Sequence, residues 1–309
     1  MLNRRHIRIK VLQILYAFFH SSEKNKNKFK IELDKSFNSS KALFFHFIKI
    51  LLELCNYSKK KLDFSYSKLR KEELNLINFF TESKIINITL KDSQLQKNLK
   101  DQNFYLNENN KILSEIFEKL STSAYLNSSI ENFRSSNNED LIIIKILEDF
   151  IIFNENIQST LNERNIYWVD DYIMINNCLK IFFKSIVKNK LLKIPPIFKN
   201  NEDVLFSKKL FSHSISNSKY YDKLIVGISE NWDQDRISDM DLILLKMALT
   251  ELTHFSSIPV KVSLNEYIEL SKDYSSKKSK IFINGILDKL VEKLLNEGEI
   301  KKLGRGLIQ

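Results

Sequence analysis

The chain has 309 residues and is 43% hydrophobic, which is enough for about two domains of ordinary size with buried cores. It contains only five glycines and three prolines, with no glycine before residue 227, so material for hairpin turns and phosphate-cradling loops is scarce and helices joined by polar loops are favoured. The net charge of +10 suggests an anionic partner, although lysine is abundant throughout the chain.

The first predicted helix lies near the amino terminus. Its apolar residues recur at spacings of three and four, as on a helix that packs against a core: Ile7, Val11, Ile14, Leu15 and Phe18. Arg4, Arg5 and Arg8 flank this stripe, and they are three of only eight arginines in a chain with 40 lysines. Because guanidinium can grip phosphate with two parallel hydrogen bonds, this segment is a candidate phosphate-binding site.

The same segment superficially resembles a signal peptide, with basic residues before the apolar run 11–19. Gln13 and Tyr16 interrupt that run, and no small-residue cleavage site follows. No other stretch approaches 18 uninterrupted apolar residues, so we expect a cytoplasmic protein without a membrane span. Cys55 and Cys178 lie in apolar runs without metal-ligand spacing, and we expect both thiols in the core.

The middle of the chain is polar, with apolar segments of varying length. We expect a polar connection over 23–36 and an amphipathic helix over 42–62. Further helices are expected within 64–140, although their boundaries cannot be placed, and then over 141–153 and 174–192. The pair Pro195-Pro196 ends this series, since proline cannot continue a helix.

The pattern becomes regular from residue 204, with helices expected around 204–215 and 220–229. Ser238 and Asp241 resemble a capping box that opens a helix over 239–255. That helix is apolar nearly all round, so it should be central. A second capping box, Ser263 with Glu266, is expected to start a helix that runs to about residue 274.

The last predicted helix begins near Ser276. Its buried face is expected to comprise Ile283, Ile286, Leu287, Leu290, Val291 and Leu294. Phe282, Lys278 and Asn284 lie off the middle of that face. Phe282 is therefore either an exposed ring that could stack on a base or a core residue at the helix edge. Gly285 either permits close helix packing or allows an RNA backbone to approach.

Residues for catalysis are not apparent. Neither G-x-x-x-x-G-K-[ST] nor G-x-G-x-x-G occurs, and the five histidines form no H-E-x-x-H or zinc-ligand pattern. Adjacent carboxylates such as Asp170-Asp171 are typical of solvated surfaces. We therefore expect no catalytic residues, no metal site and no cofactor, and an enzyme is not expected.

Two distant segments resemble the NusB family. At the start, Arg4-Arg5-His6-Ile7-Arg8 followed by Gln13-Ile14-Leu15-Tyr16 resembles its R-R-x-x-R segment leading into Q-x-L-Y. Five later segments resemble its carboxy-terminal signature in order and spacing: 246–252, 258–262, 265–266, 268–272 and 282–289. The resemblance covers about 20 initial residues and roughly 204–295, so 23–200 looks like a large insertion after the first helix.

The resemblance implies an all-α fold, in which residues 1–22 and 201–309 form a NusB-like helical bundle and residues 23–200 form a mostly helical inserted region of unknown role. It implies a transcription antitermination factor that binds boxA-type RNA together with NusE, a component of the small ribosomal subunit. That complex helps RNA polymerase read through terminators, notably in ribosomal RNA operons.

The same resemblance implies contacts for individual residues. Those expected to contact RNA are Arg4, Arg5, Arg8, Gln13, Lys246, Lys278, Lys280, Phe282 and Asn284. Tyr16 and Asp241 are expected to contact the protein partner. The main alternative is a protein-binding or ribosome-assembly adaptor that uses the same helices without reading RNA. An RNA methyltransferase with an attached NusB-like domain is a weaker alternative, because the glycine-rich cofactor loop is missing.

Overall fold

The computed structural model describes residues 1–65, 68–100, 110–136, 138–189, 192–228 and 237–307. These residues form helices, and their only β-type pairing is a single parallel bridge between Leu2 and Phe198. The predicted all-α class is therefore confirmed. None of the described helices is both long and apolar enough to cross a membrane.

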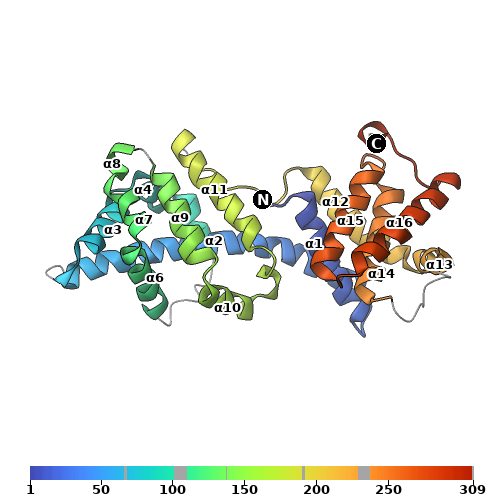
Figure 1. Cartoon of the computed structure of the whole chain (residues 1–309), viewed down its shortest axis with the longest axis horizontal. Coiled ribbons are helices and arrows are strands. Elements are labelled where there is room, and N and C mark those ends of the chain that lie inside the picture. Colours follow the sequence, from blue (N-terminus) through green and yellow to red (C-terminus); the bar gives the residue numbers. More distant parts are fainter. Residues whose placement is uncertain (66–67, 101–109, 137, 190–191, 229–236, 308–309) are drawn as a thin grey trace. The chain divides into compact units, whose positions relative to one another are not determined.

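The chain divides into two compact units, and Figure 1 labels most of their helices. Unit 1 comprises Met1 and residues 36–197, and unit 2 comprises residues 2–35 and 198–309. The boundary at residue 36 falls inside the long helix α2 (Lys26–Ser65). The functional division into a core and an insertion stays a prediction.

Unit 1 is built around the later part of α2. The other described helical segments of unit 1 are α3 (Lys71–Glu82), α4 (Lys84–Lys91), α5 (Ser93–Lys100), α6 (Asn110–Thr122), α7 (Ala124–Glu131), α8 (Phe133–Ser136), α9 (Glu139–Lys145), the π-helical η2 (Ile146–Ile152), α10 (Glu155–Arg164), the 3₁₀ turn η3 (Ile166–Trp168) and α11 (Tyr172–Asn189). Trp168 is buried against α2, where its indole Nε1 donates to the Ser39 carbonyl at 2.8 Å. Cys55 and Cys178 are both buried, as predicted.

The prediction of a polar connection over 23–36 is wrong, because α2 begins at Lys26. Phe29, Leu33 and Phe37 recur every four residues and are all buried. One narrow apolar stripe is therefore enough to hold this otherwise polar segment as a helix.

Unit 2 is a bundle of helices. Its helical segments, besides the first turns of α2, are α1 (Arg4–His20), α12 (Asn201–Ser216), α13 (Ser218–Ile228), α14 (Asp239–His254), α15 (Val260–Tyr274), α16 (Ser279–Asn296) and the 3₁₀ turn η5 (Gly304–Leu307). The central position of α14 is confirmed, since it contacts α1, α12, α13, α15 and α16. Its predicted cap is confirmed as well, because the Ser238 Oγ accepts a hydrogen bond from the Asp241 backbone N–H at 3.1 Å.

The predicted capping box at Ser263 is wrong. Helix α15 already begins at Val260, directly after Pro259, so Ser263 lies inside the first turns and is buried. Its hydroxyl donates to Glu251 on α14 at 2.8 Å instead of capping its own helix. Proline suits a helix start because its φ is already helical and it has no N–H to satisfy.

Candidate nucleic-acid interface

The first turn of α1 holds two half-exposed arginines. Asn3 caps this helix, its side chain accepting from the His6 N–H at 3.0 Å. The Arg4 Nε lies 3.1 Å from Asp203 Oδ1, and the Arg5 Nη2 lies 3.2 Å from Asp273 Oδ2. Both members of the Arg5–Asp273 pair are exposed, at 38% and 58%, so solvent screens it and a phosphate can replace this carboxylate at little cost. Arg4 is 37% exposed, but its partner Asp203 is buried, so this pair is held more firmly.

Arg8 lies inside unit 2, where its side chain is only 3% exposed. Its guanidinium grips Glu251 through two hydrogen bonds, at 2.7 and 2.8 Å, and also reaches Glu266 at 3.2 Å. Glu251 accepts two more hydrogen bonds, from Ser263 at 2.8 Å and from Tyr267 at 3.0 Å. Burial alone would lower the pKa of Arg8, but the Glu251 carboxylate outweighs burial and raises it.

This geometry corrects the expectation that Arg8 faces RNA. Its side chain is almost entirely buried, and its charge is neutralised by the carboxylates of Glu251 and Glu266. Lys246 needs the same correction, since its Nζ is 2.8 Å from Asp222 Oδ1 and lies over the Phe19 ring at 4.8 Å. Lys246 is 7% exposed, so it holds α13 against α14 rather than presenting a cation to solvent.

The start of α16 presents several of the other predicted RNA contacts. Lys278 occupies the N-cap position and Lys280 the first turn, and both are exposed. Phe282 is half-buried, whereas the neighbouring Ile283 is fully buried. Asn284 is exposed, and its amide donates to Asp288 Oδ2 at 3.0 Å. The partial exposure of Phe282 favours the stacking interpretation over the core interpretation.

Gly285 lies on the exposed face of α16, and a Cβ added there would meet no atom within 4 Å. The expectation that Gly285 allows close helix packing is therefore wrong, because nothing packs against it. A glycine in an exposed helix interior weakens the helix by about 1 kcal/mol relative to alanine.

Glu269 on α15 lies near positive charges from two other helices. The pKa of Glu269 is lowered first by a hydrogen bond from Lys272, and then by the positive charges of Lys272, Arg5 and Lys280. Arg5 belongs to α1 and Lys280 to α16, so residues 275 positions apart in the sequence act on the same carboxylate. The structure thus brings these two predicted RNA contacts onto one side of unit 2.

Asp241 is not at the surface, contrary to the expectation for a partner contact. It is 5% exposed, and its Oδ2 accepts a hydrogen bond from the Ser279 hydroxyl at 2.9 Å. Because Ser279 begins α16 and Asp241 lies in the first turn of α14, this hydrogen bond ties the two helix starts together. Asp241 therefore fixes the start of α16, which carries Lys278 and Lys280, from a buried position.

Tyr16 and Gln13 lie further along α1. Tyr16 is 40% exposed, and its ring stacks on His20 with centroids 4.1 Å apart. His20 in turn pairs with Asp239 at 2.9 Å between Nε2 and Oδ2. Gln13 is half-buried. Tyr16 is thus accessible to a protein partner, as the prediction requires.

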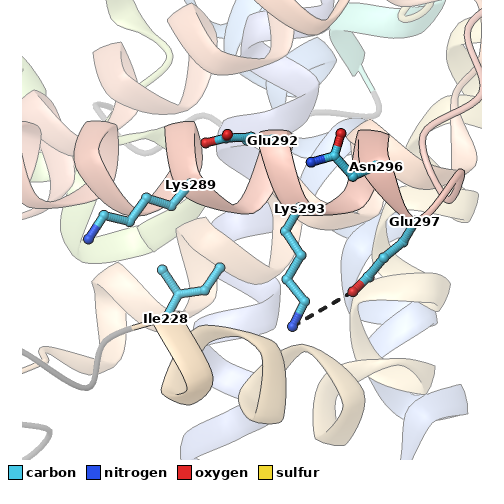
Figure 2. A pocket seen from close by; sticks show the side chains of 6 residues that line it. All are labelled: Ile228, Lys289, Glu292, Lys293, Asn296 and Glu297. Carbon is cyan, nitrogen blue, oxygen red and sulfur yellow. Dashed lines mark ion pairs between the residues drawn. The ribbon is translucent and has the colours of Figure 1, made fainter.

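Two of the hollows on the described surface of unit 2 are lined by cationic residues. The first, about 540 Å³, adjoins the arginines and is lined by Asn3, Arg4, Arg5, Arg8, Ser257, Ile258, Pro259, Val262 and Glu266. The second, about 460 Å³, lies beside the later turns of α16, with Ile228 of α13 opposite Lys289 and Lys293 (Figure 2). Lys293 there pairs with Glu297 at 4.0 Å, so the positive charge of Lys293 in this second hollow is balanced by a carboxylate. Within the described ranges, no three His, Cys, Asp or Glu residues are placed to hold a metal.

Comparison with known proteins identifies the family. A model described as the NusB family matches residues 179–292, from the middle of α11 to α16. A transcription antitermination protein NusB from Natranaerobius thermophilus is 39% identical over 95 residues, which are 31% of this chain and 68% of that relative. The chain belongs to the NusB family. Its sequence resemblance to NusB is therefore confirmed.

Two other relatives bear the same name. The NusB of Salinibacter ruber is 40% identical over 103 residues, or 33% of this chain, and that of Chloroherpeton thalassium is 36% identical over 107 residues, or 35%. The chain covers only 64% and 50% of these two relatives' own lengths. No solved structure matches the chain. The NusB-family match does not include α1, yet α1 packs on α12 and α14 within the matched region.

Proposed function

We propose that this NusB-family chain binds single-stranded boxA-type RNA together with NusE, and thereby promotes read-through by RNA polymerase, notably in ribosomal RNA operons. The protein works in the cytoplasm and catalyses no reaction. The observation that supports this most is the shared influence of Arg5 and Lys280 on Glu269. This proximity of charges supports the proposal that the arginine segment of α1 and the lysines of α16 offer cations to one ligand.

The contacts divide by accessibility. Arg4, Arg5, Lys278 and Lys280 are accessible cations suited to phosphates, while Phe282 offers a partly exposed ring for an unpaired base. Phosphate contacts supply affinity, and base stacking with hydrogen bonds from groups such as the Asn284 amide supplies selectivity. Arg8, Lys246 and Asp241 position these groups without touching RNA. Gln13, half-buried on α1, stays a candidate RNA contact at the edge of the surface.

The protein partner is proposed to bind near Tyr16. This ring is exposed on α1 and held by its stack with His20, so it is preorganised for a contact. An adaptor that binds protein alone is the second candidate, favoured by one observation: Arg4 and Arg5 already pair with carboxylates.

Titration of fluorescently labelled boxA-type RNA, with and without purified NusE, separates the two functions. RNA binding predicts saturable binding that NusE tightens, and weaker binding of a scrambled RNA of the same length and composition. Binding of NusE with no RNA binding under any condition would leave only the adaptor.

A further inference from the structure

Unit 1 contains 22 lysines and arginines against 19 aspartates and glutamates, so as a whole it is nearly neutral. Residues 83–100, which form α4 and α5 with their caps, contain four lysines and a single acid, Asp92. This segment therefore carries a net charge of +3 over 18 residues, within a unit that is nearly neutral as a whole.

The four lysines on α4 and α5 are exposed and available. They are Lys84, Lys91, Lys97 and Lys100. No ion pair to any of them occurs within the part of the chain that the structure describes. Other cations of unit 1 are neutralised, such as Lys61 by Glu73 at 2.6 Å and Lys180 by Glu148 at 2.6 Å.

The acids nearest to α4 are already committed to other groups. Both carboxylate oxygens of Glu82 bind Arg134, at 2.5 and 2.7 Å, and these contacts lower the pKa of Glu82. Asp92 caps α5, accepting from the Leu95 N–H at 2.7 Å. Glu139 accepts from the Ser83 hydroxyl at 3.1 Å and from the Ile85 N–H at 3.3 Å, at the start of α4. The carboxylates near α4 are thus engaged by other groups rather than by these lysines.

A surface hollow lies between the two lysines of α4. Its volume is about 670 Å³, and its lining is Lys84, Asn87, Ile88, Lys91 and Asp92. Residues spaced at three, four and seven lie on one helix face, so Lys84 and Lys91 stand at its two ends, about 10 Å apart along the axis. Asn87 and Ile88 form the floor between them. This arrangement suits an extended polyanion that runs along α4.

We propose that the α4–α5 lysine stripe, defined as Lys84, Lys91, Lys97 and Lys100, is a second RNA-binding surface that holds the phosphate backbone without reading sequence. Lysines act here as point charges without a planar fork, which matches backbone contact better than base recognition. This inference rests on the proposed function, since RNA is the polyanion that unit 2 would deliver. Its role is to hold RNA beyond the segment that unit 2 recognises.

The test compares the full-length chain with a Lys84→Gln, Lys91→Gln variant. The probes are a 40-nucleotide oligo-U RNA without boxA sequence and a 12-nucleotide boxA-type RNA, each titrated across a series of salt concentrations. Loss of two phosphate contacts should lower the slope of log affinity against log salt by about 1.4 for oligo-U. That slope change corresponds to roughly a 25-fold loss of affinity at 0.1 M salt relative to 1 M. Affinity for the short RNA should stay unchanged.

A matched control removes the same charge elsewhere on unit 1. Lys111 and Lys119 are exposed on α6, so the Lys111→Gln, Lys119→Gln variant has the same net charge as the test variant. Equal losses in both variants would show a mere net-charge effect and would overturn the inference. An unchanged oligo-U slope in the test variant would also overturn it and would assign the stripe to another anion, such as an acidic protein. Oligo-dT of equal length shows whether the stripe distinguishes RNA from DNA.

The two proposals fail separately. Suppose that the wild-type chain does not bind the short RNA, and that it binds oligo-U more tightly than the Lys84→Gln, Lys91→Gln variant does. The unit 2 proposal then fails and the stripe stands. If the wild-type chain binds the short RNA and the oligo-U slope does not change, the stripe alone fails. Failure of the wild-type chain to bind either RNA overturns both.

Discussion

Arg8 and Glu251 form a two-pronged ion pair in the interior of unit 2, with both hydrogen bonds shorter than 2.9 Å. Removing one partner of such a pair leaves an uncompensated buried charge, which costs about 3–5 kcal/mol. We therefore expect Arg8→Ala to lower the free energy of unfolding by that amount in urea denaturation. Arg5→Ala, at a screened surface pair, should change it by less than about 1 kcal/mol.

A second variant shows that the effect of Arg8→Ala comes from charge. Arg8→Met combined with Glu251→Gln removes both charges while keeping hydrogen-bond partners for Ser263 and Tyr267. It should recover most of the lost stability. If Arg8→Ala is as stable as the wild type, the pair does not hold α1 against α14.

Substitution of Phe282 is expected to affect RNA affinity and folding stability to different extents. Because its ring is partly exposed, Phe282→Ala should cost about 1–3 kcal/mol of RNA affinity and little stability. The adjacent Ile283→Ala is the control, since Ile283 is buried and its truncation should cost about 2–5 kcal/mol of stability. Measurement of urea midpoint and RNA affinity on the same proteins decides: a large midpoint drop for Phe282→Ala, with affinity kept in the folded fraction, would place the ring in the core.

Gly285→Ala should change stability and binding in opposite directions. The open space around Gly285 admits a methyl group, so the helix should gain about 0.5–1 kcal/mol. RNA affinity should fall if a backbone approaches this position. Gly298→Ala is the contrasting control, because its φ of 71° disfavours alanine and the variant should lose stability. Unchanged RNA affinity in Gly285→Ala would place the RNA path elsewhere.

The His20–Asp239 pair predicts a pH dependence. The pKa of His20 is raised, first by its hydrogen bond to the Tyr16 carbonyl and then by Asp239. A raised pKa in the folded state stabilises it fully below the unfolded value of about 6.5, and this contribution disappears as pH rises through the folded pKa. NMR titration should therefore show a lower pKa for His20 in Asp239→Asn, and the stability difference between the two proteins should shrink from pH 5.5 to pH 8. An identical His20 titration in both proteins would contradict the pair.

The sequence predicted the helices of unit 2 well because their apolar residues either follow the helical period, as in α1 and α16, or cover nearly the whole helix, as in α14. It failed at Ser263, where the S-x-x-E pattern is real but the helix begins one turn earlier at Val260. A local pattern cannot show that the Ser263 hydroxyl is needed by Glu251, a residue on another helix. The hydrogen bond from Ser263 to another helix therefore replaces the local cap that the pattern predicted.

The candidate interface was predicted by residue type more reliably than by exposure. Arg5, Lys280 and Phe282 are accessible, whereas Arg8 and Lys246 are buried against carboxylates. One signal could have found the partner of Arg8: Glu251 is a carboxylate in a helix that is apolar nearly all round, so it requires a buried cation. The sequence alone gave no means to choose which arginine supplies it.

The most direct test of the central claim is the salt dependence of boxA-type RNA binding by Arg5→Ala, Lys280→Ala and the double variant. If both residues hold phosphates of one RNA, each single variant should lower the log-log slope by about 0.7 and the double variant by about 1.4, without a change in the urea midpoint. Lys219→Ala, at an exposed position on α13, serves as the control and should leave the slope unchanged. Wild-type slope and affinity in the double variant would contradict the claim that α1 and α16 bind RNA together.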